Sequence, residues 1–264
     1  MDIIQAIKER RSVRSFNGQP LSETIISRLT GIVDQMSSPF SGNVTIRLKR
    51  FNITGDYRPS TYGVIKGACD FFLIAMHNDV MSLLSAGYRF EKVILEAWRL
   101  GLGSCWISAT FKNTVFDRYE SWPNGEKLTA ICPIGIPSSQ RLVERLTRTL
   151  LKSKTRKPFS ELFFISDFEH SLQPTNRYRE SLEMMRLSPS STNSQPWRAL
   201  VTGNTVHFYY IPLNPLSPLD CGIGLCHFHE AEKFRGHDGI FISTPDAPTS
   251  PKGWKYLMSF QSNS

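Results

Sequence analysis

"SPSSTNSQPWR", residues 188–198, is a short segment dense in hydroxyl and amide side chains that ends on a Pro-Trp step. This composition favours a tight loop, because Ser, Asn and Pro all stabilise turns. An expected helix around residues 177–187 precedes it. Two apolar stretches typical of strands follow it, at residues 198–203 and 206–212. The segment therefore joins a helix to a sheet, as expected in an α+β protein.

The elements around this loop recur along the chain. In the first part the sequence predicts helices at 2–11 and after Pro20 (Ser22 as N-cap), strands at 43–53 and 71–76, a long helix over 82–104 and a strand at 127–137. In the second part, a helix near 221–234 and strands at 239–244 and 254–260 follow the quoted loop. The stretch VDQMSSPFSGNVTIRL (33–48) takes the place in the first part that EMMRLSPSSTNSQPWRAL (183–200) takes in the second. We predict two similar halves, residues 1–165 and 166–264.

Composition limits the class of protein. The chain has 264 residues, of which 40% are hydrophobic and 20% charged, enough for a packed core and against disorder. Its apolar runs fall short of the roughly 20 residues that a membrane span needs, and MDIIQAIKER lacks the apolar core of a secretory signal. We expect a soluble cytoplasmic protein with no membrane partner.

The cysteines and histidines of CGIGLCHFH (221–229) raise the question of a metal site. Metal ligands commonly come in closely spaced pairs from two segments, and this sequence offers no second segment. The pattern favours the start of a helix rich in small residues. The five cysteines are scattered, without a CxxC pair, and are expected to be reduced.

The net charge of +8 is concentrated in RLVERLTRTLLKSKTRK (141–157). Its basic residues recur at helical spacing. Three interpretations remain for such a run: a solvated helix face, a nucleic-acid patch, or a pocket for a phosphorylated ligand. No dedicated nucleic-acid module is present, so we expect no nucleic-acid partner.

Four segments carry a resemblance. RRSVRSF (10–16), GLGSCWIS (101–108), KSKTRKP (152–158) and PSSTNSQPW (189–197) resemble the flavin-binding segments of the FMN-dependent nitroreductase family. The resemblance implies α+β homodimers with FMN at the subunit interface, where the basic segment of one subunit faces the polar loop of the other. Here one chain carries both, far apart.

We therefore predict a nitroreductase-like fold of two similar halves that form an intrachain pseudo-dimer, with central antiparallel or mixed sheets flanked by helices. Such a chain would act as a monomer, with further association left open. In the second half CGIGLCHF is taken to replace GLGSCWIS, and the first half's polar loop lacks the Gln-Pro-Trp ending. One good flavin site is then expected.

The resemblance also implies roles for individual residues. Arg10, Arg11, Ser12, Lys154 and Arg156 are expected at the FMN phosphate, which needs positive charge and donors. Arg14 is expected at the pyrimidine edge, where a cation stabilises the charge that collects on reduction. The other expected contacts are Trp106, Ile107, Ser108 and Ala109 at flavin N5, Pro189, Ser190, Ser191 and Asn193 at the ring and ribityl chain, and Tyr62 and Gly63 in place of the family's Asn and Lys. Which of Arg10 and Arg11 points inward stays open.

The implied activity is transfer of hydride from NADH or NADPH through FMN to an electron-poor small molecule, a nitroaromatic or a quinone. The sequence has no GxGxxG after a strand, so the nicotinamide is expected to bind only transiently. Two alternatives remain: a flavin-binding dehydrogenase or dehalogenase, and a degenerate flavin-binding scaffold without catalysis.

Overall fold

The computed structural model describes residues 1–52, 60–118, 120–138 and 155–263. Elements of the first part are α1 (Ile3–Glu9), α2 (Glu23–Gln35), β1 (Val44–Arg50), β2 (Asp70–Met76), α3 (Val80–Arg99), β3 (Gly103–Ser104), α4 (Asn113–Phe116), η1 (Pro123–Gly125) and β4 (Lys127–Gly135). Elements of the second part are η2 (Phe159–Glu161), β5 (Phe163–Ile165), β6 (Asp167–Ser171), α6 (Arg179–Leu187), η3 (Ser191–Asn193), β7 (Trp197–Thr202), β8 (Thr205–Tyr210), α7 (Ser217–Phe234), β9 (Gly239–Ile242) and β10 (Lys255–Ser262). The expected basic helix, with Lys154, lies outside the described residues except for 155–157.

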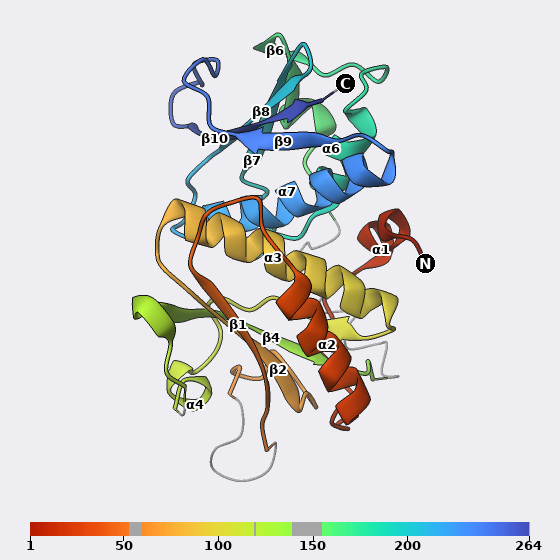
Figure 1. Ribbon diagram of the computed structural model, residues 1–264, viewed down its shortest axis with the longest axis vertical. Helices are drawn as coiled ribbons and strands as arrows, with labels where there is room; N and C mark the ends of the chain where they lie inside the picture. The colour runs from red at the N-terminus through yellow and green to blue at the C-terminus, as the bar shows by residue number, and fades with distance from the viewer. Residues whose placement is uncertain (53–59, 119, 139–154, 264) are drawn as a thin grey trace.

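The strands form two sheets. One has the order β1-β2-β4-β3 and is antiparallel; the other has the order β6-β5-β7-β8-β10-β9, in which only β5 and β7 run parallel. Helices α3 and α7 lie between the two sheets (Figure 1). The predicted α+β class with antiparallel and mixed sheets flanked by helices is confirmed. The order β1-β2-β4-β3 recurs in the second sheet as β7-β8-β10-β9.

Helices α3 and α7 cross through a pair of glycines. A Cβ on Gly87 would lie 2.1 Å from the Leu219 carbonyl oxygen, and one on Gly222 would lie 2.2 Å from the Leu84 carbonyl oxygen. The two contacts are reciprocal, since each glycine faces the carbonyl three residues before the other. Only glycine allows this backbone approach, and it accounts for two glycines in helix interiors where they otherwise cost stability.

Local sequence explains where the elements begin and what they bury. Ser22 caps α2 as predicted, accepting from the Ile25 N–H, and Asp79 caps α3 by accepting from the Ser82 N–H. Strand β2 is buried along its whole length, as its apolar run predicts. The expected core positions of the long helix are confirmed: Leu84, Tyr88, Val93 and Leu95 are buried, and Trp98 is partly buried.

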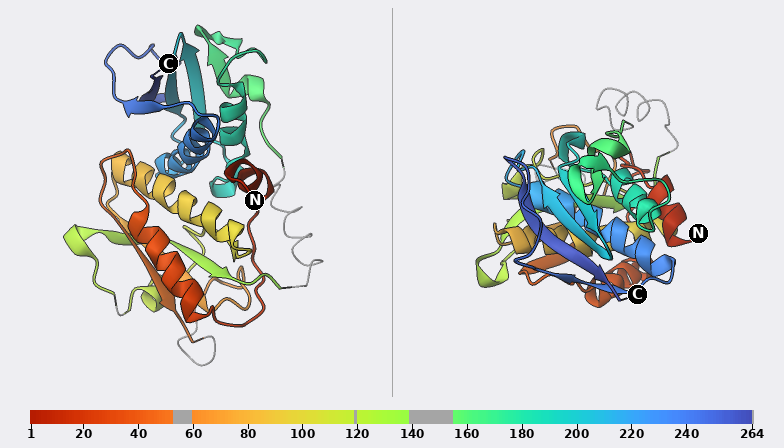
Figure 2. Two further views of the ribbon diagram at one scale, coloured as in Figure 1. Left: turned by 45° about the vertical axis from the view of Figure 1, so that its right-hand side comes forward. Right: turned by 90° about the horizontal axis from the view of Figure 1, so that it is seen from above.

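The helix at the start of the chain packs on the second part. Helix α1 lies against α6 and α7 (Figure 2), and its Ala6 and Ile7 join the same core cluster as Met184. The residues that follow α1 therefore begin beside helices of both parts of the chain, α3, α6 and α7.

The segment CGIGLCHF lies inside α7, opposite α3. It therefore does not replace GLGSCWIS, which forms the turn after α3; the turn after α7 begins at Gly236, with φ of 76° against 79° at Gly101. The helix predicted near 221–234 is therefore confirmed, while its correspondence with GLGSCWIS is wrong. Among the described residues no cluster of ligands suits a metal ion. Within the same residues, every helix is too short or too polar to cross a bilayer.

Candidate functional site

Arg10 points into the protein. Its side chain is only 5% exposed, and its Nε lies 3.4 Å from Oε1 of Glu91, a residue of α3 with no exposed surface. Glu91 also accepts from Trp106 Nε1 at 2.8 Å and lies 3.0 Å from His227 Nε2 of α7. The buried carboxylate thus joins three segments. Burial by itself would raise the pKa of Glu91, but these partners outweigh it and keep that pKa below the usual range.

Arg11 points the other way. It is exposed, and its guanidinium lies 5.5 Å from the centre of the Trp98 ring. The question left open by the sequence is answered: Arg10 is the inward residue and Arg11 lies on the surface.

Ser12 and Arg14 sit on an extended segment between two others. Ser12 forms a bridge with Ser104, and the Arg14 carbonyl accepts from the Lys66 N–H at 2.9 Å. Arg14 Nε is buried and has no hydrogen-bond partner among the described residues, whereas Arg10 Nε faces the Glu91 carboxylate. The buried donor of Arg14 lacks an acceptor, which an anionic group would supply.

Of the predicted residues 106–109 in the segment after α3, Trp106 bonds to Glu91 of this cluster. Ile107 exchanges both backbone hydrogen bonds with Ile131 of β4, so its N–H is already occupied. Ser108 and Ala109 come next, partly buried and exposed, and line a cavity of about 510 Å³. Buried apolar side chains of Met76, Phe111 and Leu128 line the same cavity.

Tyr62 and Gly63 form a tight turn at positive φ, 50° and 79°. Tyr62 is 69% exposed, and the turn leads into the segment that pairs with Ser15 and Arg14 through Lys66. Tyr62 and Gly63 thus lie four and three positions before Lys66, the residue that pairs with the Arg14 segment.

The polar loop, residues 188–196, has an unusual backbone. Thr192, Asn193 and Gln195 all have positive φ, between 49° and 57°, although none is glycine. Side-chain hydrogen bonds hold this shape: Ser190 Oγ accepts from the Gln195 N–H at 2.9 Å, and Asp220 of α7 accepts from the Ser191 N–H at 3.0 Å. Pro189, Ser190, Ser191 and Asn193 are all partly buried.

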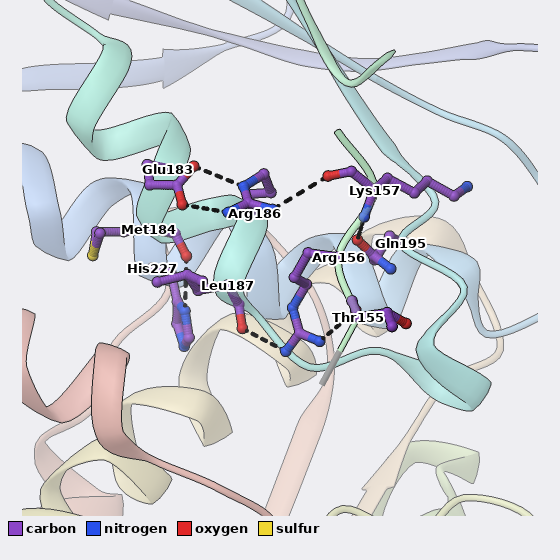
Figure 3. A network of polar contacts seen from close by, with 9 residues as sticks. All are labelled: Thr155, Arg156, Lys157, Glu183, Met184, Arg186, Leu187, Gln195 and His227. Carbon is purple, nitrogen blue, oxygen red and sulfur yellow. Dashed lines mark hydrogen bonds and ion pairs between the residues drawn. The ribbon is translucent and has the colours of Figure 1, made fainter. Parts of the chain in front are cut away.

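The segment 155–157 is bound to this loop. Arg156 donates to Asn193 Oδ1 at 3.2 Å and to the Leu187 carbonyl at 2.9 Å, and the Lys157 N–H donates to Gln195 Oε1 at 2.8 Å. Figure 3 shows the Arg156 side chain under the end of α6, with its guanidinium turned to Leu187. The described part of the predicted segment 152–158 therefore contacts the predicted segment 189–197.

The positive charge of Arg10, in the basic segment 10–16, acts on Arg156, which is bonded to the polar loop. Burial lowers the pKa of Arg156, and the charges of Arg10 and Arg186 lower it further. Arg10 therefore lies within electrostatic reach of Arg156, although the two are far apart in sequence. Arg186 already pairs with Glu183, so an anion near Arg10 and Arg156 would relieve the remaining repulsion. These two cations therefore suit a phosphate or another anionic ligand.

Three residues of the site were not predicted from the sequence: Glu91, His227 and Asp220. Each lies in a helix whose apolar pattern indicated core packing. Asp220 is 3% exposed, and burial raises its pKa from 3.8 to about 7, although hydrogen bonds from Ser191 and Ser194 oppose the rise. A charged residue in a buried helix face was the only sequence feature that could have marked them.

Comparison with known proteins bears on this geometry. Residues 2–232 match the family model described as "Putative TM nitroreductase". The chain belongs to this nitroreductase family. A solved structure described as a putative nitroreductase from Thermotoga maritima MSB8 is 18% identical, covers 100% of this chain and 95% of its own, and superimposes with a TM-score of 0.65. That likeness shows the nitroreductase fold over the full chain.

Shorter relatives cover part of it. A nitroreductase family protein from Clostridium difficile 630 is 16% identical and covers 61% of this chain and 96% of its own, with a TM-score of 0.45. A putative nitroreductase in complex with FMN from Desulfovibrio desulfuricans is 20% identical and covers 55% and 95%, with a TM-score of 0.41. No curated protein matches the chain.

Proposed function

We propose that this nitroreductase family member is an FMN-dependent oxidoreductase that passes hydride from NADH or NADPH to an electron-poor small molecule, a nitroaromatic or a quinone. The observation that carries the proposal is the hydrogen bonding of Arg156 to the polar loop, with the charge of Arg10 acting on Arg156 from a distant part of the sequence. The FMN complex of the Desulfovibrio desulfuricans relative supports the choice of cofactor.

The residues present fit the group. The phosphate would be held by Arg10, Ser12 and Arg156, where the charge of Arg10 lowers the pKa of Arg156 and an anion would relieve their repulsion. The flavin supplies the hydride chemistry when bound. Arg14 would bring positive charge to its pyrimidine edge, and Pro189 to Asn193 would line the ring and ribityl chain.

The acceptor would enter beside Ser108 and Ala109. The cavity there offers an apolar wall of Met76, Phe111 and Leu128, which suits an aromatic or quinonoid ring. The chain's own role is then to orient the two reactants and to exclude water, and the reaction needs no nucleophilic side chain.

We further propose that the chain is an internal pseudo-dimer of halves 1–165 and 166–264, acting as a monomer. Two features support this arrangement: the strand order that recurs in the second sheet, and the reciprocal contacts of Gly87 and Gly222. Strand β5, at the end of the first half, pairs with β7 of the second half. This strand pairing would hold the two halves together.

The test is the visible absorption spectrum of the purified chain after incubation with FMN and gel filtration. One retained flavin per chain, reduced by NADH or NADPH and reoxidised by a nitroaromatic or quinone, is the expected result. Retained flavin without turnover would mean a non-catalytic flavin protein. If no flavin is retained, the proposal fails.

A pair of arginine variants sharpens the test. Arg14→Ala should weaken FMN binding by roughly 10- to 100-fold, since hydrogen bonds to charged groups contribute about 1.5–3 kcal/mol. Arg11→Ala, on the exposed side of the same segment, is the matched control and should change affinity far less. Equal losses in the two variants would contradict the placement of Arg14.

A further inference from the structure

A second cavity lies where the helices α1, α6 and α7 pack together (Figure 2), and none of its lining residues is expected to hold flavin. Its volume is about 370 Å³, and its apolar wall consists of Ile4, Met184, Ala231 and Phe234. Met184 and Ala231 are buried, whereas Phe234 is 55% exposed. An apolar body in this cavity would cover ring surface that water now contacts, which is favourable.

The carboxylates that line this cavity already have cationic partners. Glu180 pairs with Arg235, which also lines the cavity, at 3.1 Å. Glu183 accepts two hydrogen bonds from Arg186, at 2.7 and 2.6 Å, and Figure 3 shows its carboxylate turned toward that guanidinium. Arg186 also donates to the Lys157 carbonyl oxygen, which fixes the pair further. These carboxylates are therefore engaged by other cations.

Two cations of the lining, Lys8 of α1 and Arg179 of α6, form no salt bridge within the described part of the chain. The guanidinium carbon of Arg179 lies 3.4 Å from the centre of the Phe159 ring. A guanidinium stacked on a ring face keeps the N–H donors in its own plane for other acceptors. Arg179 is thus held in place with donors that suit a carboxylate, which a guanidinium binds through two parallel hydrogen bonds.

We propose that this cavity is a second ligand site, which binds a small monocarboxylate with an apolar body. The carboxylate pairs with Arg179 and Lys8, and the apolar body lies on Met184 and Phe234. A neutral or cationic head group fits less well, because it leaves both cations without a negative partner. The volume lies at the lower end of the range of about 300–1,000 Å³ for small-molecule sites, so the ligand is small. The proposal does not depend on FMN binding.

The first experiment is calorimetric titration of the full chain, without added flavin, with octanoate and with octanol. One saturable site per chain is expected for octanoate, with an affinity about tenfold or more above that for octanol, because only the carboxylate forms charge-assisted hydrogen bonds. Equal affinities for the two compounds, or no saturable binding of octanoate, would overturn the proposal.

Charge variants test the two cations. Arg179→Gln and Lys8→Met should each weaken octanoate binding by about tenfold, as expected for loss of a hydrogen bond between charged groups. Lys233→Met is the matched control, because Lys233 is an exposed cation beside Phe234 that pairs with Glu230 and does not line the cavity. An equal loss in Lys233→Met would mean that only the overall charge attracts octanoate, and the proposed site would be wrong.

A signal from the cavity wall locates the ligand in the unmodified chain. Carbon NMR of labelled methionine methyl groups, with the Met184 signal assigned by its loss in Met184→Leu, reports on the buried wall. Octanoate should shift this signal, with the midpoint of the shift at the dissociation constant found by calorimetry. A Met184 signal that stays fixed while octanoate binds would place the ligand elsewhere and overturn the proposal, whether or not the chain retains FMN.

Discussion

The loop 36–43 after α2 and the loop 188–196 after α6 occupy similar places, each between a helix and a strand, yet they differ in what they contact. Phe40 of the first loop is 5% exposed and packs edge-on against Tyr88 and Phe241, with ring centres 5.4 and 5.1 Å away. The second loop instead carries hydroxyl and amide side chains, and its Asn193 accepts a hydrogen bond from Arg156.

The turns after the two long helices differ in the same way. Trp106, after α3, gives its indole N–H to the buried carboxylate of Glu91. Phe241, after α7, packs on His229, whose ring lies in an apolar setting that lowers its pKa to about 3 and keeps it neutral. One side of the molecule is closed by uncharged aromatic rings and the other holds buried ions. The second side thus carries the cations that an anionic cofactor needs, which supports the proposal of one flavin site.

Removing the aromatic closure is the largest expected change. Phe40→Ala should lower the free energy of unfolding by about 3–5 kcal/mol, since it leaves a cavity among packed rings. Urea denaturation measures this, with Phe234→Ala as the control because Phe234 is 55% exposed. The number of flavins per chain should stay at one, because space alone does not supply cations. Two flavins per chain in Phe40→Ala would show that the ring is the sole difference between the sides.

Asp220, beneath the polar loop, should make stability depend on pH. Its folded-state pKa is raised to about 7, so the folded chain binds more protons than the unfolded chain between about pH 4 and 7. Stability from this group is therefore full at low pH and is lost as the pH rises through 7, by about 4 kcal/mol at most. Asp220→Asn should remove that trend in urea denaturation from pH 4.5 to 8.

The control for Asp220 is Asp167→Asn, at an exposed aspartate whose pKa is lowered by a hydrogen bond from His170. That variant should not remove the loss of stability with rising pH. If Asp220→Asn and the unmodified chain follow parallel curves, the carboxyl is ionised across the whole range and the burial argument is wrong.

The same contrast explains how far sequence reasoning reached. Caps, apolar runs and glycine-ended helices are local features, so Ser22, β2 and the turn at Gly101 could be predicted. The polar loop could be found because its residues are neighbours in sequence. Glu91 and His227 are 136 positions apart, and each sits on a helix whose spacing indicates burial, so nothing local shows that they meet. The helix predicted near 221–234 is confirmed by α7, but the correspondence of CGIGLCHF with GLGSCWIS was wrong, because the small residues of α7 serve a helix crossing that the sequence does not display.

A substitution at Asn193 is expected to give the smallest change in free energy, and it compares the two loops most directly. Its amide accepts from Arg156 and donates to the Thr155 carbonyl, which ties the segment 155–157 to the loop. Asn193→Gly removes these bonds without strain, because glycine tolerates its φ of 57°. FMN affinity should fall about tenfold, as for the loss of roughly 1–2 kcal/mol of hydrogen bonding. Asn43→Gly in the first loop is the matched control and should leave FMN affinity unchanged, measured by flavin fluorescence titration. An equal loss in both variants would mean that the two loops contribute alike and that the flavin does not distinguish the charged side from the aromatic one.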